Sequence, residues 1–198
     1  MAKRSANSKG YSDRKVNNRE VKQTFLIVCE GKETEPSYFR GFKCRTLSLK
    51  IEGKGKDPIN LVKRAKTLSS EDEFDQVWCV FDRDEIPSKD FESALKIADE
   101  NDIKIAYSNE AFELWYILHF HFLNSAIPRS DYPKKLSILM EKPYAKNSRD
   151  MYDELFSLQS KAIANADRLL QEYSTSDPVT DNPSTTVHHL VKELNRFI

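Results

Sequence analysis

The sequence has few cysteines, and their spacing excludes both a disulfide framework and a zinc finger. Only three occur in 198 residues, at Cys29, Cys44 and Cys79, and no two of them form a Cys-x-x-Cys pair. An odd number of unclustered cysteines, two of them inside apolar segments, predicts reduced and packed thiols. This usage is typical of a cytoplasmic protein.

Long apolar runs are also lacking. No run approaches the roughly 20 residues that a membrane-spanning helix requires, and the first residues have no apolar signal-peptide core. Hydrophobic residues make up 39% of the chain and charged residues 31%, which is typical of a soluble globular protein with a core. We therefore expect a cytoplasmic localisation and no membrane partner.

Several catalytic and ligand-binding signatures are missing as well. The sequence contains no Walker-type glycine-rich loop, no G-x-G-x-x-G and no Ser-His-Asp signature. His119 and His121 are two residues apart on an expected helix, and His188 and His189 are adjacent, so we expect each pair to diverge. The histidines are therefore not predicted to form a zinc site.

The net charge is zero, but the basic residues are not evenly distributed. Residues 1–22 contain seven lysines and arginines, two acidic residues and almost no apolar ones. Such a segment cannot form a core, and we predict a flexible basic arm. The arm could contact a polyanion such as a nucleic acid, or it could simply keep the chain soluble.

Strand patterns alternate with helical patterns four times after this arm. Strand and helix units in series predict an α/β fold with a mostly parallel sheet, flanked by helices and joined by right-handed crossovers. The expected strands are TFLIVCE (24–30), LSLKIE (47–52), VWCVF (77–81) and DIKIAYS (102–108), and the expected helices are TEPSYFRGF (34–42), DPINLVKRAKTL (57–68), PSKDFESALKIADEN (87–101) and NEAFELWYILHF (109–120).

Beyond about residue 125 prolines punctuate the chain and helical patterns dominate. We expect helices within 152–173 and 185–198. Residues 23–198 are predicted to form a single domain, whose helical C-terminal part, from about 125 to 198, covers one face or edge of the sheet.

Acidic residues follow two of the expected strands. Glu30 ends the first strand, and Asp82 and Asp84 end the third, with Arg83 between them pointing away. Ligands of parallel sheets bind at the carboxyl ends of the strands, so neighbouring strands would bring these three carboxylates together. Close like charges need a cation between them, and an all-oxygen site suits Mg²⁺ or Mn²⁺ rather than zinc.

The residues after Glu30 fit a phosphate ligand. Gly31 permits a tight exit from the strand and lets a phosphate approach the backbone, and Lys32 offers a phosphate contact. The alternative is that Glu30 only serves the dipole of the helix that follows it.

A second acidic pair follows the fourth strand. Glu110 and Glu113 are three residues apart on an expected helix that Ser108 or Asn109 would cap, so they would share one face. Glu110 is predicted as a further metal ligand because it begins this helix at the same edge of the sheet. Glu113 could belong to the site or could pair with a nearby lysine or arginine.

The blocks VCEGKETEPSYF and VFDRDE, in this order and at strand ends, resemble the Toprim domain of topoisomerases, primases and OLD-type nucleases. Together with SNEAFELWYILHF, KAIANADRL and DNPSTTVHHLVKEL, the chain from about Thr24 to its end resembles the RloB-like proteins, a bacterial family often linked with an AAA-type ATPase and phage defence. The resemblance implies a Toprim-like fold with an acidic metal site.

The resemblance also implies roles for individual residues. Asp82 and Asp84 would hold a metal that stabilises a transferring phosphoryl group, and Glu30 would act in proton transfer. Glu110 and Glu113 match the family block NE-x-FE-x-W. Polar residues of later blocks could contact phosphate or a partner, although Ser184 or Thr185 could instead cap the last helix; these residues are Lys146, Asn182, Ser184, Thr185 and His188.

The expected function is Mg²⁺-dependent endonuclease activity on DNA or RNA, as the effector of an anti-phage, abortive-infection system restrained by an AAA-type ATPase. The chain could also form a homodimer. A second hypothesis is a non-catalytic Toprim-like module that binds an ATPase or nucleic acid. A phosphatase or receiver domain fits less well, because those folds place aspartate after the first strand, and no nucleophilic tyrosine for topoisomerase chemistry is identifiable.

Overall fold

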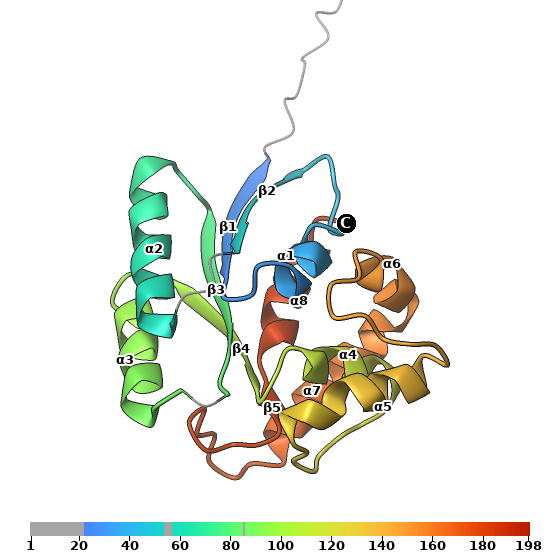
Figure 1. Cartoon of the computed structure of the whole chain (residues 1–198). Coiled ribbons are helices and arrows are strands. Elements are labelled where there is room, and N and C mark those ends of the chain that lie inside the picture. Colours follow the sequence, from blue (N-terminus) through green and yellow to red (C-terminus); the bar gives the residue numbers. More distant parts are fainter. Residues whose placement is uncertain (1–21, 54–56, 85) are drawn as a thin grey trace, which may run out of the picture.

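The computed structural model describes residues 22–53, 57–84 and 86–198 (Figure 1). The predicted basic arm of residues 1–22 therefore lies outside the described residues, apart from Lys22, which is exposed. None of the described helices combines the length and the apolar character that crossing a membrane would require.

Five strands form one sheet in the order β2-β1-β3-β4-β5. The first four are parallel and β5 runs antiparallel to β4, which confirms the predicted α/β class with a mostly parallel sheet. The strands are β1 (Gln23–Cys29), β2 (Leu47–Gly53), β3 (Gln76–Asp82), β4 (Lys104–Asn109) and β5 (Ser184–Thr185).

The central strand β1 is apolar because both of its faces are covered. Phe25, Ile27 and Cys29 belong to the core on one side of the sheet, whereas Leu26 and Val28 belong to the core on the other. All five side chains are fully buried, as expected for an internal parallel strand.

Helices α2 (Pro58–Glu71) and α3 (Ser88–Asp99) cover one face of the sheet (Figure 1). The helix α2 begins as predicted, because the Asp57 carboxylate accepts a hydrogen bond from the Asn60 backbone N–H at 3.0 Å. Phe81 of β3 packs edge-on against Phe91 of α3, which fixes that helix against the sheet.

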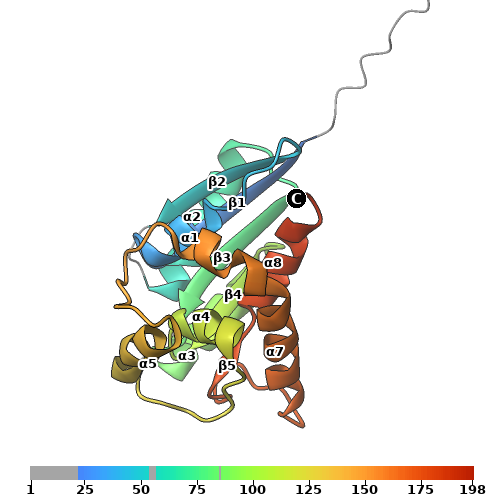
Figure 2. The same cartoon turned by 90° about the vertical axis from the view of Figure 1, so that its right-hand side faces the viewer.

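The remaining helices lie on the opposite face, which confirms that the C-terminal part is mainly helical and covers one side of the sheet (Figures 1 and 2). Helix α8 packs along β4, and α7 packs against α4 and α8. The helices are α1 (Thr34–Phe39), α4 (Glu113–Phe120), α5 (Tyr132–Leu139), α6 (Met151–Leu155), α7 (Gln159–Gln171) and α8 (Val187–Asn195), with 3₁₀ turns η1 (Arg129–Asp131) and η2 (Phe156–Leu158).

One local prediction was wrong and another was confirmed only in part. The helix expected from Asn109 begins only at Glu113, and Ser184 and Thr185, the candidate caps of the last helix, form the strand β5. Ser108 and Asn109 stay in β4 because they pair with this strand. The Thr185 hydroxyl nevertheless accepts a hydrogen bond from the backbone N–H of Val187, the first residue of α8, at 3.3 Å.

Candidate metal centre

The strand-end carboxylates of β1 and β3 lie together, because these two strands are direct neighbours in the sheet. Glu30 follows the last residue of β1 and Asp82 is the last residue of β3. The backbone N–H of Asp82 donates a hydrogen bond to Glu30 Oε2 at 3.1 Å. Register between the strands thus holds both acids at one rim of the sheet.

A pocket of about 490 Å³ opens at this rim. Four of its charged residues were not predicted as site residues: Glu33, Glu35, Asp57 and Arg129. Glu113 lines the pocket whereas Glu110 does not. The acids that line the pocket are Glu30, Glu33, Glu35, Asp57, Asp82 and Glu113, and the cations are Lys32, Arg129 and Lys146.

Glu35 on α1 points back toward the strand end. Its side chain is buried, and a Cβ atom on Gly31 would overlap its carboxylate. Gly31 therefore leaves room for the Glu35 carboxylate. The prediction had been that a phosphate approaches the glycine backbone. Among the described residues, Glu35 Oε2 has no hydrogen-bond partner.

Asp82 is deeply placed in the pocket. Its side chain is buried, and its Oδ1 atom has no hydrogen-bond partner within residues 22–53, 57–84 and 86–198. Burial raises the pKa of the Asp82 carboxyl well above its usual value, and the neighbouring Glu35 raises it further. Burial also raises the pKa of Glu30 and of Glu35. Carboxylates crowded in this way gain stability from a cation between them.

Arg129 of η1 supplies a positive charge at the edge of this cluster. Its Nη2 atom lies 3.0 Å from Asp82 Oδ2, and its Nη1 atom pairs with Asp84 Oδ2. Asp84 has a left-handed backbone, with φ of 29°, and its side chain is directed to Arg129. The guanidinium thus bridges the two aspartates of the D-x-D pair, and Asp84 is not part of the pocket lining.

Arg83 between the aspartates points to the other face of the sheet, as predicted. Its guanidinium lies 5.1 Å from the centre of the Phe91 ring and donates a hydrogen bond to Val179 O at 3.1 Å. Alternation along the strand therefore separates this arginine from the pocket.

The prediction that Glu110 and Glu113 share one helix face was wrong, because Glu110 precedes α4. Glu110 accepts hydrogen bonds from the Arg129 backbone N–H at 3.0 Å and from Asn182 Nδ2 at 3.2 Å. Glu113 is buried and accepts a hydrogen bond from the Tyr144 hydroxyl at 3.2 Å. The alternative prediction was a lysine or arginine partner, and the partner in this hydrogen bond is a tyrosine.

Lys32 and Lys146 border the pocket with exposed side chains. The carbonyl of Lys146 accepts a hydrogen bond from the Thr34 hydroxyl at 2.8 Å, which holds the segment before α6 against α1. Both ammonium groups can therefore reach an anion that enters the pocket.

The donor set of this site fits a hard divalent cation. Its buried oxygens come from Glu35, Asp82 and Glu113, with Glu30 beside them, and two of the carboxylate oxygens lack partners among the residues that the structure describes. Carboxylate oxygens without nitrogen or sulfur ligands suit Mg²⁺ or Mn²⁺.

The predicted divergence of the histidine pairs was wrong for His188 and His189, whose ring centres are 4.1 Å apart. Neither ring lines the acidic pocket. His119 is buried at the end of α4 with its Nδ1 atom 2.9 Å from Trp115 O, and His121 lies just beyond this helix.

The comparison with protein-family models identifies the chain. The model described as RloB-like protein matches residues 25–194, a range that includes every charged residue of the pocket. Comparisons with curated proteins and with solved structures returned no match. Because the matched range spans most of the sequence, the chain belongs to the RloB-like protein family.

Proposed function

We propose that this protein is a metal-dependent nuclease that hydrolyses phosphodiester bonds of DNA or RNA. The observation that carries the proposal is a pocket at the strand ends with four converging carboxylates, Glu30, Glu35, Asp82 and Glu113. Two buried carboxylate oxygens in it have no hydrogen-bond partner in the described part of the chain. The sequence resemblance to Toprim domains supports the same chemistry.

In this proposal Asp82, Glu35 and Glu113 hold Mg²⁺ or Mn²⁺. The bound ion would stabilise negative charge on the phosphoryl group during hydrolysis. Asp84 and Glu110, which bind Arg129, would complete the metal environment from outside the pocket lining.

Glu30 is proposed to move a proton between the attacking water and the leaving oxygen. Burial raises its pKa, so it can exchange a proton more readily near neutral pH than an exposed carboxyl. The hydrogen bond from the Asp82 backbone fixes one of its oxygens, which orients the other for this transfer. Lys32 and Lys146 would bind the phosphates on either side of the cleaved bond.

The biological setting is proposed from the family resemblance. It suggests an effector of bacterial anti-phage defence that acts in the cytoplasm by abortive infection, together with an AAA-type ATPase. Nucleic acid would be the substrate, and a homodimer is a further proposed assembly.

One observation favours a second function, a non-catalytic module that binds an ATPase or nucleic acid. Arg129 pairs with both Asp82 and Asp84, so part of the charge of the site is neutralised by the chain itself. A module that never binds a metal would need such a permanent counter-charge.

The test measures cleavage of plasmid DNA and of tRNA with Mg²⁺ or Mn²⁺, with and without the ATPase. We expect cleavage by the parent and a loss of about a hundredfold or more in Asp82→Asn and Glu30→Gln. Glu92→Gln, an exposed acid of α3, is the matched control and should cleave like the parent. Unchanged cleavage in the two site variants would exclude this site, whereas tight binding without cleavage would favour the module.

A further inference from the structure

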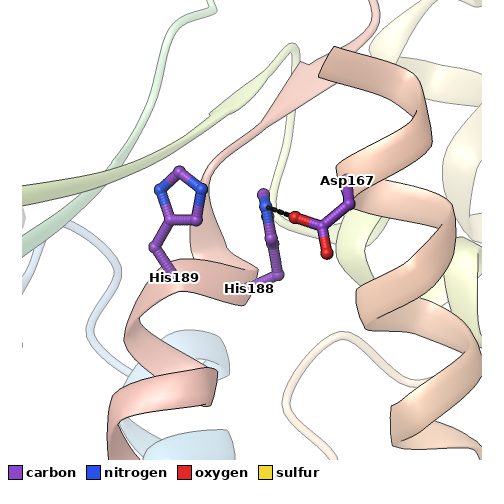
Figure 3. Close-up of side chains that lie close together, drawn as sticks. All are labelled: Asp167, His188 and His189. Atoms are coloured by element: carbon purple, nitrogen blue, oxygen red, sulfur yellow. Dashed lines mark ion pairs between the residues drawn. The ribbon is translucent and has the colours of Figure 1, made fainter. Parts of the chain in front are cut away.

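A second group of metal-ligating side chains lies away from the acidic pocket. It consists of Asp167 on α7 and of His188 and His189 at the start of α8 (Figure 3). One ligand atom from each of the three side chains lies within 4.8 Å of the other two. None of the three residues lines the acidic pocket.

His188 is the unusual member of this group. Its side chain is 0% exposed. Its Nε2 atom lies 3.1 Å from Asp167 Oδ1, the contact that the dashed line in Figure 3 marks, whereas its Nδ1 atom has no hydrogen-bond partner in the described part of the chain. A neutral imidazole has one N–H donor and one lone-pair acceptor, so a buried ring with a polar contact at only one nitrogen has room for a further ligand.

The other two side chains give an ion access to this ring. His189 is exposed and Asp167 is partly buried, so the group extends from the core to the surface of the molecule. The rings of His188 and His189 lie side by side and the Asp167 carboxylate faces His188 (Figure 3). A water molecule could take a fourth position on the open side.

A cation already lies at the Asp167 carboxylate. Lys192 Nζ is 2.7 Å from each of its two oxygens. The lysine side chain is 42% exposed, so its ammonium group can move into solvent when another cation takes its place.

We propose that Asp167, His188 and His189 bind a divalent transition-metal ion of the zinc class, which ties α7 to α8. Two imidazole nitrogens and one carboxylate oxygen are the ligand set of open zinc sites and favour zinc over Mg²⁺. The ion would bind the buried His188 ring, which contacts Asp167, the acid of this group. Because α8 packs along β4, the site would stabilise the C-terminal helices against the sheet. This proposal does not depend on nuclease activity.

The test titrates Zn²⁺ into the chelator-treated full chain by calorimetry. The absorption spectrum of Co²⁺ bound in place of zinc gives a second measure of which residues are ligands. Zinc can also bind carboxylates, so the titration uses the Asp82→Asn background. We expect one site per chain that Mg²⁺ does not occupy. Asp167→Asn and His189→Gln should each weaken zinc binding by about a hundredfold, and circular dichroism checks that both variants fold.

Two controls separate a metal site from an ordinary hydrogen-bonded or ionic network. His121→Gln changes a histidine outside the group and should leave zinc binding unchanged. Lys192→Gln removes the competing ammonium group, so it should tighten zinc binding several-fold, whereas a network without a metal predicts no change in zinc affinity. Zinc binding that is absent, or that is equal in the parent, Asp167→Asn and His189→Gln, would overturn the proposal.

Discussion

Gly31 and Glu35 together shape the bottom of the acidic pocket. The space that a side chain on residue 31 would fill is taken by the Glu35 carboxylate. Glu35 is 5% exposed, so its negative charge is concentrated beside Asp82 instead of being solvated. A larger residue at position 31 would displace an acid of the site, which gives this glycine a role in the charge of the pocket.

His119 provides a prediction about pH. It is fully buried, and burial lowers its pKa to about 4. Between about pH 6.5 and pH 4 the unfolded chain therefore binds a proton that the folded chain does not, and the free energy of unfolding falls as the pH falls. We expect His119→Leu to remove up to about 3 kcal/mol of this acid destabilisation.

Urea unfolding of parent and variant at about pH 7.5 and about pH 4.5 measures this effect. The difference in unfolding free energy between the two pH values is compared in parent and variant. This comparison isolates His119 from the carboxyl groups that titrate in both proteins. Parallel pH dependences in parent and variant would contradict a neutral His119 in the folded chain.

At the scale of elements, the turn η1 places its first residue, Arg129, over the two aspartates of the D-x-D pair. Removing this guanidinium leaves Asp82 without its cation, so Arg129→Ala should lower metal-free stability by about 1–3 kcal/mol. The same change should increase the stabilisation that Mg²⁺ gives, because the ion no longer competes with an internal cation.

Thermal unfolding with and without Mg²⁺ tests the Arg129 prediction without any assay of activity. Arg64→Ala is the matched control, since Arg64 pairs with Glu52 at 3.2 Å outside the pocket lining. A Mg²⁺ response that is the same in the parent and in both variants would show that Arg129 does not occupy a cation site.

The elements that follow from local sequence pattern were predicted well. The strands β1 and β3 are apolar runs and β2 has an alternating pattern, and the parallel arrangement of β1 and β3 brings Glu30 next to Asp82. The strand β5 has two residues and no periodicity, and it exists because Ser184 and Thr185 pair with residues of β4 about 75 positions earlier in the chain. Such a pairing is visible only in the folded chain.

The difference between local sequence pattern and long-range packing also explains which site residues were missed. Glu35 is neither at a strand end nor part of the D-x-D pair, and Arg129 lies in a segment without a regular pattern. Their positions depend on packing between elements. The acid run in GKETE was a usable signal for Glu35, because a buried helix that begins with acids beside a strand end can direct one of them inward.

At the scale of the molecule, one sheet separates two apolar cores, and the acidic pocket opens at the ends of its central strands. The net charge of the sequence is zero, so long-range attraction of a polyanion cannot come from the total charge. Binding of nucleic acid would depend on a few local cations.

This leads to a prediction about salt dependence. The double variant Lys32→Gln and Lys146→Gln should weaken binding of duplex DNA or RNA and reduce the slope of log Kd against log salt by about 2. Fluorescence anisotropy at several salt concentrations measures both quantities. Lys66→Gln, an exposed lysine of α2, should leave the slope unchanged. An unaltered slope in the double variant would remove these two lysines from the nucleic-acid contact.

The four converging carboxylates of the pocket come from the residue that follows β1 and from α1, β3 and α4, which together span more than 80 positions of the chain. No proteolytic fragment that ends before α4 can carry the complete ligand set. Inactivity of a truncated form would therefore report that the sheet and its helices are incomplete, and it would say nothing about the chemistry of the acids that remain.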